Sequence, residues 1–142
     1  MALITSRNFV LPQLSDAMRT YVWFNMWTKK LWPYNELDPG ETLLWYESPN
    51  RRIVWSTNVT DVTRFPYSRR EEVADKLKLS AVDAGQPYLV DAPASGFCLS
   101  YKVAPLERLE LSRPDDFRFP QQGWLRIEES VVQKWPALGS FV

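Results

Sequence analysis

The sequence predicts an α+β domain in which a curved, largely antiparallel β-sheet or small β-barrel carries helices on its outside. Three observations predict this class. Helical patterns are few, most strand patterns are joined by hairpin-like loops, and no repeat, low-complexity tract or linker divides the chain. A length of 142 residues suits one domain with a real core, so we expect a single domain over residues 1–142.

The first part of the chain predicts a strand and then a helix. Residues 2–6 (ALITS) are apolar and short, as in a strand. Ser15 and Asp16 form a candidate N-cap for a short helix through residues 17–27. Pro33 should end regular structure, because its ring removes a backbone donor.

A hairpin of two strands follows. Residues 38–40 (DPG) are a turn signal before a strand at residues 41–48 (ETLLWYES), and residues 48–52 (SPNRR) form a hairpin loop. Residues 52–65 are β-branched and alternate in polarity, which predicts a long strand interrupted at Pro66. Regular alternation would place two sets of side chains on opposite faces: Ile53, Trp55, Thr57 and Val59, and Val54, Ser56, Asn58 and Thr60.

The remaining elements alternate between helix, loop and strand. Residues 68–82 predict a helix with Ser68 as N-cap and Glu71 completing a capping box. The other expected elements are a loop at 83–96, a strand at 97–111 bent or broken at Pro105, a loop at 113–123, a strand at 123–127 and a closing helix at 128–135.

The residue types limit the catalytic and metal-binding chemistry that the chain can perform. The chain has no histidine and one cysteine, Cys98, so it contains no Ser-His-Asp or Cys-His arrangement and no histidine- or thiolate-based zinc site. The carboxylate pairs are sequence neighbours, two of them at helix starts, and carry little weight as catalytic dyads. We therefore expect a protein that is not an enzyme, with no catalytic residue, no metal site and no cofactor.

The chain also shows no targeting feature. No apolar run approaches the length of a membrane span, and the first residues lack the pattern of a secretion signal. A single cysteine fits a reducing compartment. We expect a soluble cytoplasmic protein without a membrane partner.

Charge and aromatic content favour a binding role. The formal net charge is zero, but residues 1–70 carry nine Lys or Arg against six Asp or Glu. The bland alternative, solvated loop charges, fits equally well. Residues 20–34 (TYVWFNMWTKKLWPY) hold six aromatic residues, and the chain holds seven tryptophans. Most of these rings should lie in the core, although such a segment also suits stacking on a planar ligand.

Several segments in order resemble the EVE domain of the PUA-like superfamily. These are the first strand ending in Thr5-Ser6, the strand GETLLWYES at residues 40–48, the strand VWSTNV and the later YKVAPLERLEL. The segment FNMWT is similar to the Tyr-Asn-Val-Trp-Ser element of the related YTH domains. The chain departs from the family where Trp55 and Ser56 replace small residues. The resemblance implies a PUA-like fold.

The resemblance also implies a base-binding pocket in which Trp27 is a cage wall and Asn25 a polar neighbour. A second wall has no motif match, and Phe65, Tyr67 and Tyr88 are its candidates. Side chains that donate and accept hydrogen bonds suit the reading of a base edge. The full predicted pocket comprises Ser6, Asn25, Trp27, Trp32, Tyr46, Ser48, Ser56, Phe65 and Tyr67. The expected phosphate contacts are Lys29, Lys30, Arg51, Arg52, Arg64, Arg69 and Arg70.

Such a domain would read a modified base in double-stranded DNA, most simply 5-methylcytosine or 5-hydroxymethylcytosine, by flipping it into the aromatic cage. EVE domains are often fused to nucleases, so the expected context is the targeting domain of a modification-dependent restriction endonuclease. Three alternatives stay open: a reader of N6-methyladenine or structured RNA, a small PUA-like enzyme that uses carboxylate and lysine, and a protein-interaction module.

Overall fold

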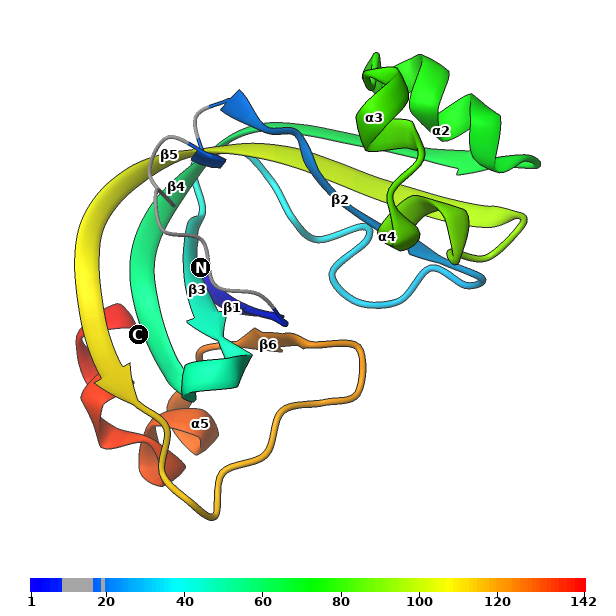
Figure 1. The fold of residues 1–142 in the computed structure, drawn as a ribbon. Helices are drawn as coiled ribbons and strands as arrows, with labels where there is room; N and C mark the ends of the chain where they lie inside the picture. The colour runs from blue at the N-terminus through cyan, green and yellow to red at the C-terminus, as the bar shows by residue number, and fades with distance from the viewer. Residues whose placement is uncertain (9–16, 19) are drawn as a thin grey trace. The chain divides into compact units, whose positions relative to one another are not determined.

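The computed structural model describes residues 1–8, 17–18 and 20–142 and contains one six-stranded sheet with short helices (Figure 1). The strand order is β2-β5-β4-β3-β1-β6. The strands are β1 (Ala2–Arg7), β2 (Trp23–Trp27), β3 (Thr42–Glu47), β4 (Arg52–Tyr67), β5 (Gly96–Ser112) and β6 (Trp124–Arg126). The helices are η1 (Ser48–Asn50), α2 (Arg70–Leu77), α3 (Ala81–Ala84), α4 (Pro87–Val90), α5 (Glu129–Lys134) and η2 (Pro136–Phe141). Within the described residues, no helix combines the length and apolar character needed to cross a membrane.

The chain forms two compact units. The first unit comprises Met1–Tyr21, Asp38–Asp61 and Lys102–Val142, and the second comprises Val22–Leu37 and Val62–Tyr101. The two long strands β4 and β5 contribute residues to both. We describe each unit by itself.

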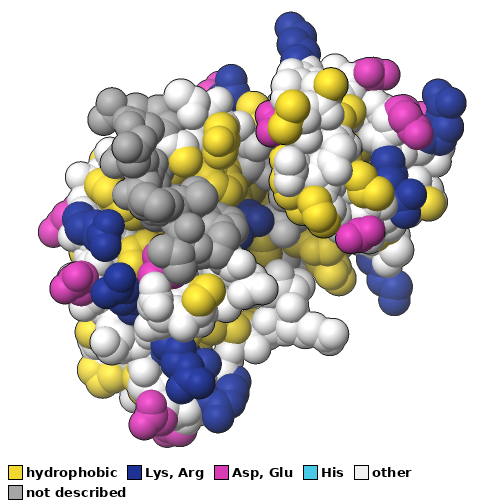
Figure 2. Space-filling model, viewed as in Figure 1, with side chains coloured by type: hydrophobic (Ala, Val, Ile, Leu, Met, Phe, Trp, Pro, Cys, Tyr) yellow, Lys and Arg dark blue, Asp and Glu magenta, His cyan; other side chains and the backbone are white. Residues whose placement is uncertain are grey.

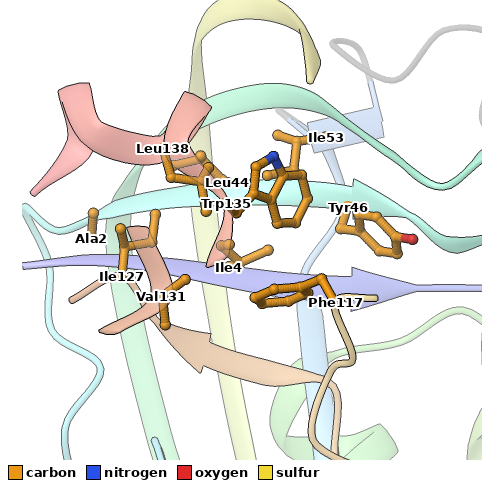
Figure 3. Packing of buried hydrophobic residues seen from close by; sticks show 10 residues of the cluster. All are labelled: Ala2, Ile4, Leu44, Tyr46, Ile53, Phe117, Ile127, Val131, Trp135 and Leu138. Atoms are coloured by element: carbon orange, nitrogen blue, oxygen red, sulfur yellow. The ribbon is translucent and has the colours of Figure 1, made fainter. Parts of the chain in front are cut away.

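In the first unit, β1 pairs in parallel with β3 and antiparallel with β6, and β3 forms an antiparallel hairpin with β4. Alternate residues of β1 and β3 point into one apolar cluster that α5 and η2 complete (Figure 3). The buried members are Ala2, Ile4, Leu44, Tyr46, Ile53, Phe117, Ile127, Val131, Trp135 and Leu138. Burial of this many large side chains is the main source of stability for the unit.

A β-bulge changes the faces of β4. Trp55 pairs with Trp45, whereas Ile53 pairs with Tyr46, so Val54 is an extra residue on the β4 side. Trp45 and Tyr46 face opposite sides of the sheet, and Ile53 and Trp55 therefore do too. The expectation that Ile53 and Trp55 share a face is wrong, because alternation in sequence assumes a strand without a bulge.

In the second unit, β2 pairs antiparallel with the first residues of β5. Helices α2 and α4 lie over one face of these strands (Figure 1), where Phe65, Tyr67, Val73, Leu89 and Cys98 form a buried cluster. Phe24 and Met26 of β2 pack against this cluster. Trp23, Asn25 and Trp27, which alternate with Phe24 and Met26 along β2, point to the opposite face.

Several sequence expectations need correction. Residues 23–27 form strand β2 and not a helix, because the edge of β5 supplies backbone partners from Phe97 to Tyr101. The proposed N-cap at Ser15 and Asp16 lies outside the described residues. Residues 81–84 and 87–90, expected partly as loop, form the short helices α3 and α4.

Neither proline breaks its strand. Pro66 lies within β4 and Pro105 within β5. The pairing of β3 with β4 covers only Arg52–Asn58 of β4, and the pairing of β2 with β5 ends at Tyr101. Both prolines therefore lie beyond these two paired stretches, and a proline is tolerated where one side of its strand is unpaired.

The helix α2 is capped one residue later than expected. Its N-cap is Arg69, and the carboxylate of Glu72, not Glu71, accepts hydrogen bonds from the N–H and hydroxyl of Ser68 at 2.8 and 2.6 Å. The hydrogen bonds from Ser68 lower the pKa of Glu72. The other expected strands, and the closing helix, are confirmed with shifts at their ends.

Candidate nucleic-acid interface

The predicted pocket residues are divided between the two units. Ser6, Tyr46, Ser48 and Ser56 belong to the first unit, and Asn25, Trp27, Trp32, Phe65 and Tyr67 belong to the second. Each unit therefore has its own candidate surface. A single pocket that combines all nine residues stays a prediction.

In the first unit, the carboxyl ends of the parallel strands β1 and β3 lie side by side. We call this end of the two strands the carboxyl-end edge. Ser6 pairs with Tyr46, and just beyond them the Ser48 hydroxyl donates to Asn8 Oδ1 at 3.5 Å. The edge thus gathers three of the four predicted pocket residues of this unit. Ser56 lies further inside the sheet, opposite Leu44, and is 4% exposed.

Tyr46 is a core residue with its hydroxyl at the margin. Its ring centroid lies 4.5 Å from that of Phe119 and 6.2 Å from that of Trp135. The hydroxyl points away from the rest of the cluster in Figure 3. Burial raises the pKa of Tyr46, and the positive charges of Arg113 and Arg51 partly oppose that rise. The ring is therefore not free to stack on a base, although the hydroxyl remains at the edge.

A buried carboxylate occupies the opposite face of the same edge. Glu47 is 7% exposed and accepts a hydrogen bond from Asn50 Nδ2. Arg52 Nε lies 3.5 Å from Glu47, and the Arg52 guanidinium also lies 3.8 Å from Glu110. Arg52 is thus neutralised by two carboxylates, which weakens it as a phosphate contact.

The other arginine of the hairpin tip has a different environment. Arg51 is exposed and adopts a left-handed backbone with φ of 54°. Its carbonyl accepts a hydrogen bond from the backbone N–H of Arg113 at 2.9 Å. No carboxylate lies within 4 Å of either guanidinium among the described residues.

In the second unit, the candidate surface is the face of β2 and β5 opposite the one against which residues of α2 and α4 pack. Trp27 pairs with Phe97 and Asn25 with Leu99 across the two strands, so their side chains share this face. Trp27, Phe97 and Asn25 are half-buried. Gly96 allows the close approach of these strands, since a Cβ there would lie 2.1 Å from the Trp27 carbonyl oxygen.

The loop after β2 lies against the same face. The ring of Tyr34 meets that of Phe97 edge-on at 5.6 Å, and the Lys30 ammonium lies 5.3 Å from the centroid of Phe97. Arg64 fixes the loop: its Nε donates to the Tyr34 carbonyl at 2.6 Å and its Nη2 donates to the Leu37 carbonyl. Trp32 lies half-buried in this loop.

Two predicted cage residues lie on the helix-covered face instead. Phe65 and Tyr67 are 5% and 4% exposed, and the Tyr67 hydroxyl donates to the Pro93 carbonyl at 2.9 Å. Tyr88 is exposed on the same side, where its ring lies 5.6 Å from that of Phe24. The half-buried side chains nearest Trp27 in sheet register are therefore Phe97 and Asn25.

The predicted phosphate contacts of this unit differ in their exposure to solvent. Lys29, Lys30 and Arg69 are exposed, whereas Arg64 and Arg70 are half-buried. Arg70 Nε donates to the Ala92 carbonyl at 2.8 Å. On the face drawn in Figure 2, Lys and Arg side chains lie in separate groups with carboxylates among them.

Sequence reasoning missed Phe97, Tyr34 and Arg113. Phe97 begins an alternating run, FCLSY, which signals a strand but not the strand that lies beside it. Tyr34 falls within the noted aromatic segment. Arg113 carries no local signal, because its neighbour Arg51 is distant in the sequence.

No protein-family profile and no curated protein matches the chain by sequence. Solved structures share its fold, which is the α+β PUA-like fold expected from the sequence. The ASCH protein of Zymomonas mobilis superposes with a TM-score of 0.56 at 13% identity, over 96% of this chain and 94% of that one. A point variant of the same protein gives 0.57 at 13% identity, over 96% and 95%. The N-terminal domain of Staphylothermus marinus McrB gives 0.54 at 12% identity, over 96% and 93%.

Proposed function

We propose that this chain binds nucleic acid and reads a modified base as an EVE-type domain. The base is 5-methylcytosine or 5-hydroxymethylcytosine, flipped out of double-stranded DNA. The chain acts by binding and not by catalysis, and it targets a fused or associated nuclease in modification-dependent restriction. The PUA-like fold, shared with an ASCH protein and an McrB N-terminal domain, supports this proposal at the level of fold.

The observation that carries the proposal is the face of β2 and β5 in the second unit that lies opposite α2 and α4. There Trp27 and Phe97 lie side by side, Asn25 follows on the same face, and Lys29 and Lys30 come directly after the strand. Stacking of a base on an aromatic ring contributes ~1–3 kcal/mol. The methyl group adds only about 0.8 kcal/mol, so an amide such as that of Asn25 is needed to read the base edge.

The test is a fluorescence-anisotropy titration with a labelled duplex that carries plain, methylated or hydroxymethylated cytosine. The wild-type chain should bind a modified duplex more tightly than the plain one. Trp27→Ala should weaken that binding about tenfold or more, as expected for the loss of one stacked base. Tyr88→Ala is the matched control, because it removes an exposed ring from the opposite, helix-covered side of the same unit.

Replacement of Lys29 and Lys30 should change duplex binding in a different way from replacement of Trp27. Lys29→Gln with Lys30→Gln should weaken plain and modified duplexes equally and flatten the salt dependence, because phosphate contacts carry no base information. The exposed pair Lys102→Gln with Lys134→Gln changes the net charge by the same amount and should have little effect.

Three outcomes contradict the proposal. Equal affinity for all three duplexes would refute recognition of a modified base. Tighter binding of RNA with N6-methyladenine in a parallel titration would refute DNA as the ligand. Turnover of a modified nucleoside, followed by mass spectrometry, would make the chain an enzyme.

A further inference from the structure

Two arginines from distant parts of the sequence are hydrogen-bonded through their backbones in the first unit, and both act on one tyrosine hydroxyl. The backbone hydrogen bond from Arg113 to Arg51 holds the end of β5 beside the β3–β4 hairpin, and Tyr46 lies on the same hairpin. The electrostatic influence of both guanidinium groups reaches the Tyr46 hydroxyl. Figure 3 shows the Tyr46 hydroxyl at the margin of the apolar cluster.

Two side-chain donors in this region have no acceptor among the described residues. The Tyr46 hydroxyl makes no hydrogen bond there, and the Arg113 Nε is buried without an acceptor. A buried donor without an acceptor costs free energy, and an anion would satisfy it. The neighbouring carboxylates are already occupied, since Glu47 and Glu110 both lie against Arg52.

The backbone conformation at the hairpin tip supports the same conclusion. Arg51 occupies a left-handed position, with φ of 54°, that glycine or asparagine fills at lower cost. A charged side chain in that position is a feature that stability alone does not favour.

We propose that Arg51, Arg113 and the Tyr46 hydroxyl form a phosphate-binding subsite. The inference rests on the proposed function in naming the ligand, which is a phosphate of the nucleic-acid backbone. Guanidinium groups bind phosphate oxygens with paired charged hydrogen bonds, and a phenol hydroxyl donates a further one. Arg52, although adjacent, takes no part because two carboxylates neutralise it.

The test compares Arg51→Gln with Arg113→Gln against the matched control Arg52→Gln, which removes one charge from the same hairpin tip. Each variant of the first pair should weaken duplex binding about five- to tenfold at low salt, whatever the base modification. Each should also lower the slope of log affinity against log salt by about 0.9. Arg52→Gln should change neither. Tyr46→Phe, which keeps the buried ring, should give a smaller loss of affinity with an unchanged thermal midpoint.

A second arm uses inorganic tripolyphosphate in a thermal-shift titration and separates this inference from the proposed function. The wild-type chain should be stabilised, and the Arg51 and Arg113 variants should lose that stabilisation. If duplexes bind but Arg51→Gln and Arg113→Gln behave like Arg52→Gln, the subsite is refuted and the function stands. If no nucleic acid binds, the function is refuted. The tripolyphosphate arm then decides the subsite alone, and a stabilisation that is equal in all variants, or absent, overturns it.

Discussion

Replacement of Arg64 tests whether this residue holds a loop or contacts phosphate. The sequence predicts a phosphate contact, but in the structure Arg64 donates to the carbonyls of Tyr34 and Leu37. In Arg64→Met the aliphatic stem remains and both charged hydrogen bonds are lost. Bonds of this kind contribute about 1.5–3 kcal/mol each when buried.

Arg64 is only half-buried, so the two bonds together should stabilise the fold by about 2–4 kcal/mol after allowance for solvent. For a chain of this length that corresponds to a loss of about 7–14 °C in the melting temperature. Arg69→Met, at an exposed position in the same unit, should stay within about 0.5 kcal/mol of the wild type.

The assay is chemical and thermal denaturation, with hydrogen exchange followed in the peptide that covers residues 28–37. Arg64→Met should accelerate exchange there more than in α2. Arg64→Lys discriminates the two roles, because an ammonium keeps the charge but cannot span both carbonyls. A lysine variant with wild-type stability, combined with a methionine variant that matches Arg69→Met, would refute the structural role.

Three further predictions concern other groups. Burial raises the pKa of the Cys98 thiol to about 12, so iodoacetamide at pH 8 should modify the native chain very slowly and the unfolded chain readily; rapid native modification, seen by mass spectrometry, contradicts this. Glu72→Gln should be less stable than the wild type at pH 7. Because the hydrogen bonds from Ser68 lower the folded-state pKa of Glu72 below the ordinary 4.5, the gap should close as pH falls through that lowered pKa; an equal gap in urea denaturation at pH 7 and pH 3 would be inconsistent. Thr57→Val removes the acceptor, at 3.0 Å, of the Trp45 indole N–H, and should cost about 1–3 kcal/mol in urea denaturation; an unchanged midpoint would show that the bond adds nothing.

The sequence predicted the hairpin well because its signals are local. Turn residues border β3 and β4, and β-branched residues fill both strands. The strand β2 was mistaken for a helix because apolar side chains occupy both of its faces: Phe24 and Met26 face the helices, and Trp23 and Trp27 face the other side. A strand with two apolar faces shows no alternation, and only its partner β5 reveals it.

The sequence names candidate site residues, but it does not say on which face of the sheet each one lies. The sequence singled out Trp27 and Asn25, which share a face, and equally Phe65 and Tyr67, which lie buried beneath α2 and α4. The local sequence shows that an aromatic residue is present, whereas the pairing of the strands determines on which face of the sheet its ring lies. The same limit explains why Arg51 and Arg52 looked equivalent, although their carboxylate neighbours differ.

The bulge at Val54 links the core and the charged edge of the first unit. With a regular register, Ile53 would fall on the face of Trp55 and leave the apolar cluster, and Arg52, the one residue before it on β4, would also change sides. Arg52 would then lose Glu47, and that carboxylate would remain buried without its cation. Burial of Ile53 and pairing of Glu47 therefore favour the same bulged register. In that register Glu47 pairs with Arg52 and not with Arg51. The Arg51 guanidinium therefore has no carboxylate partner among the described residues and can bind an anion from outside the chain.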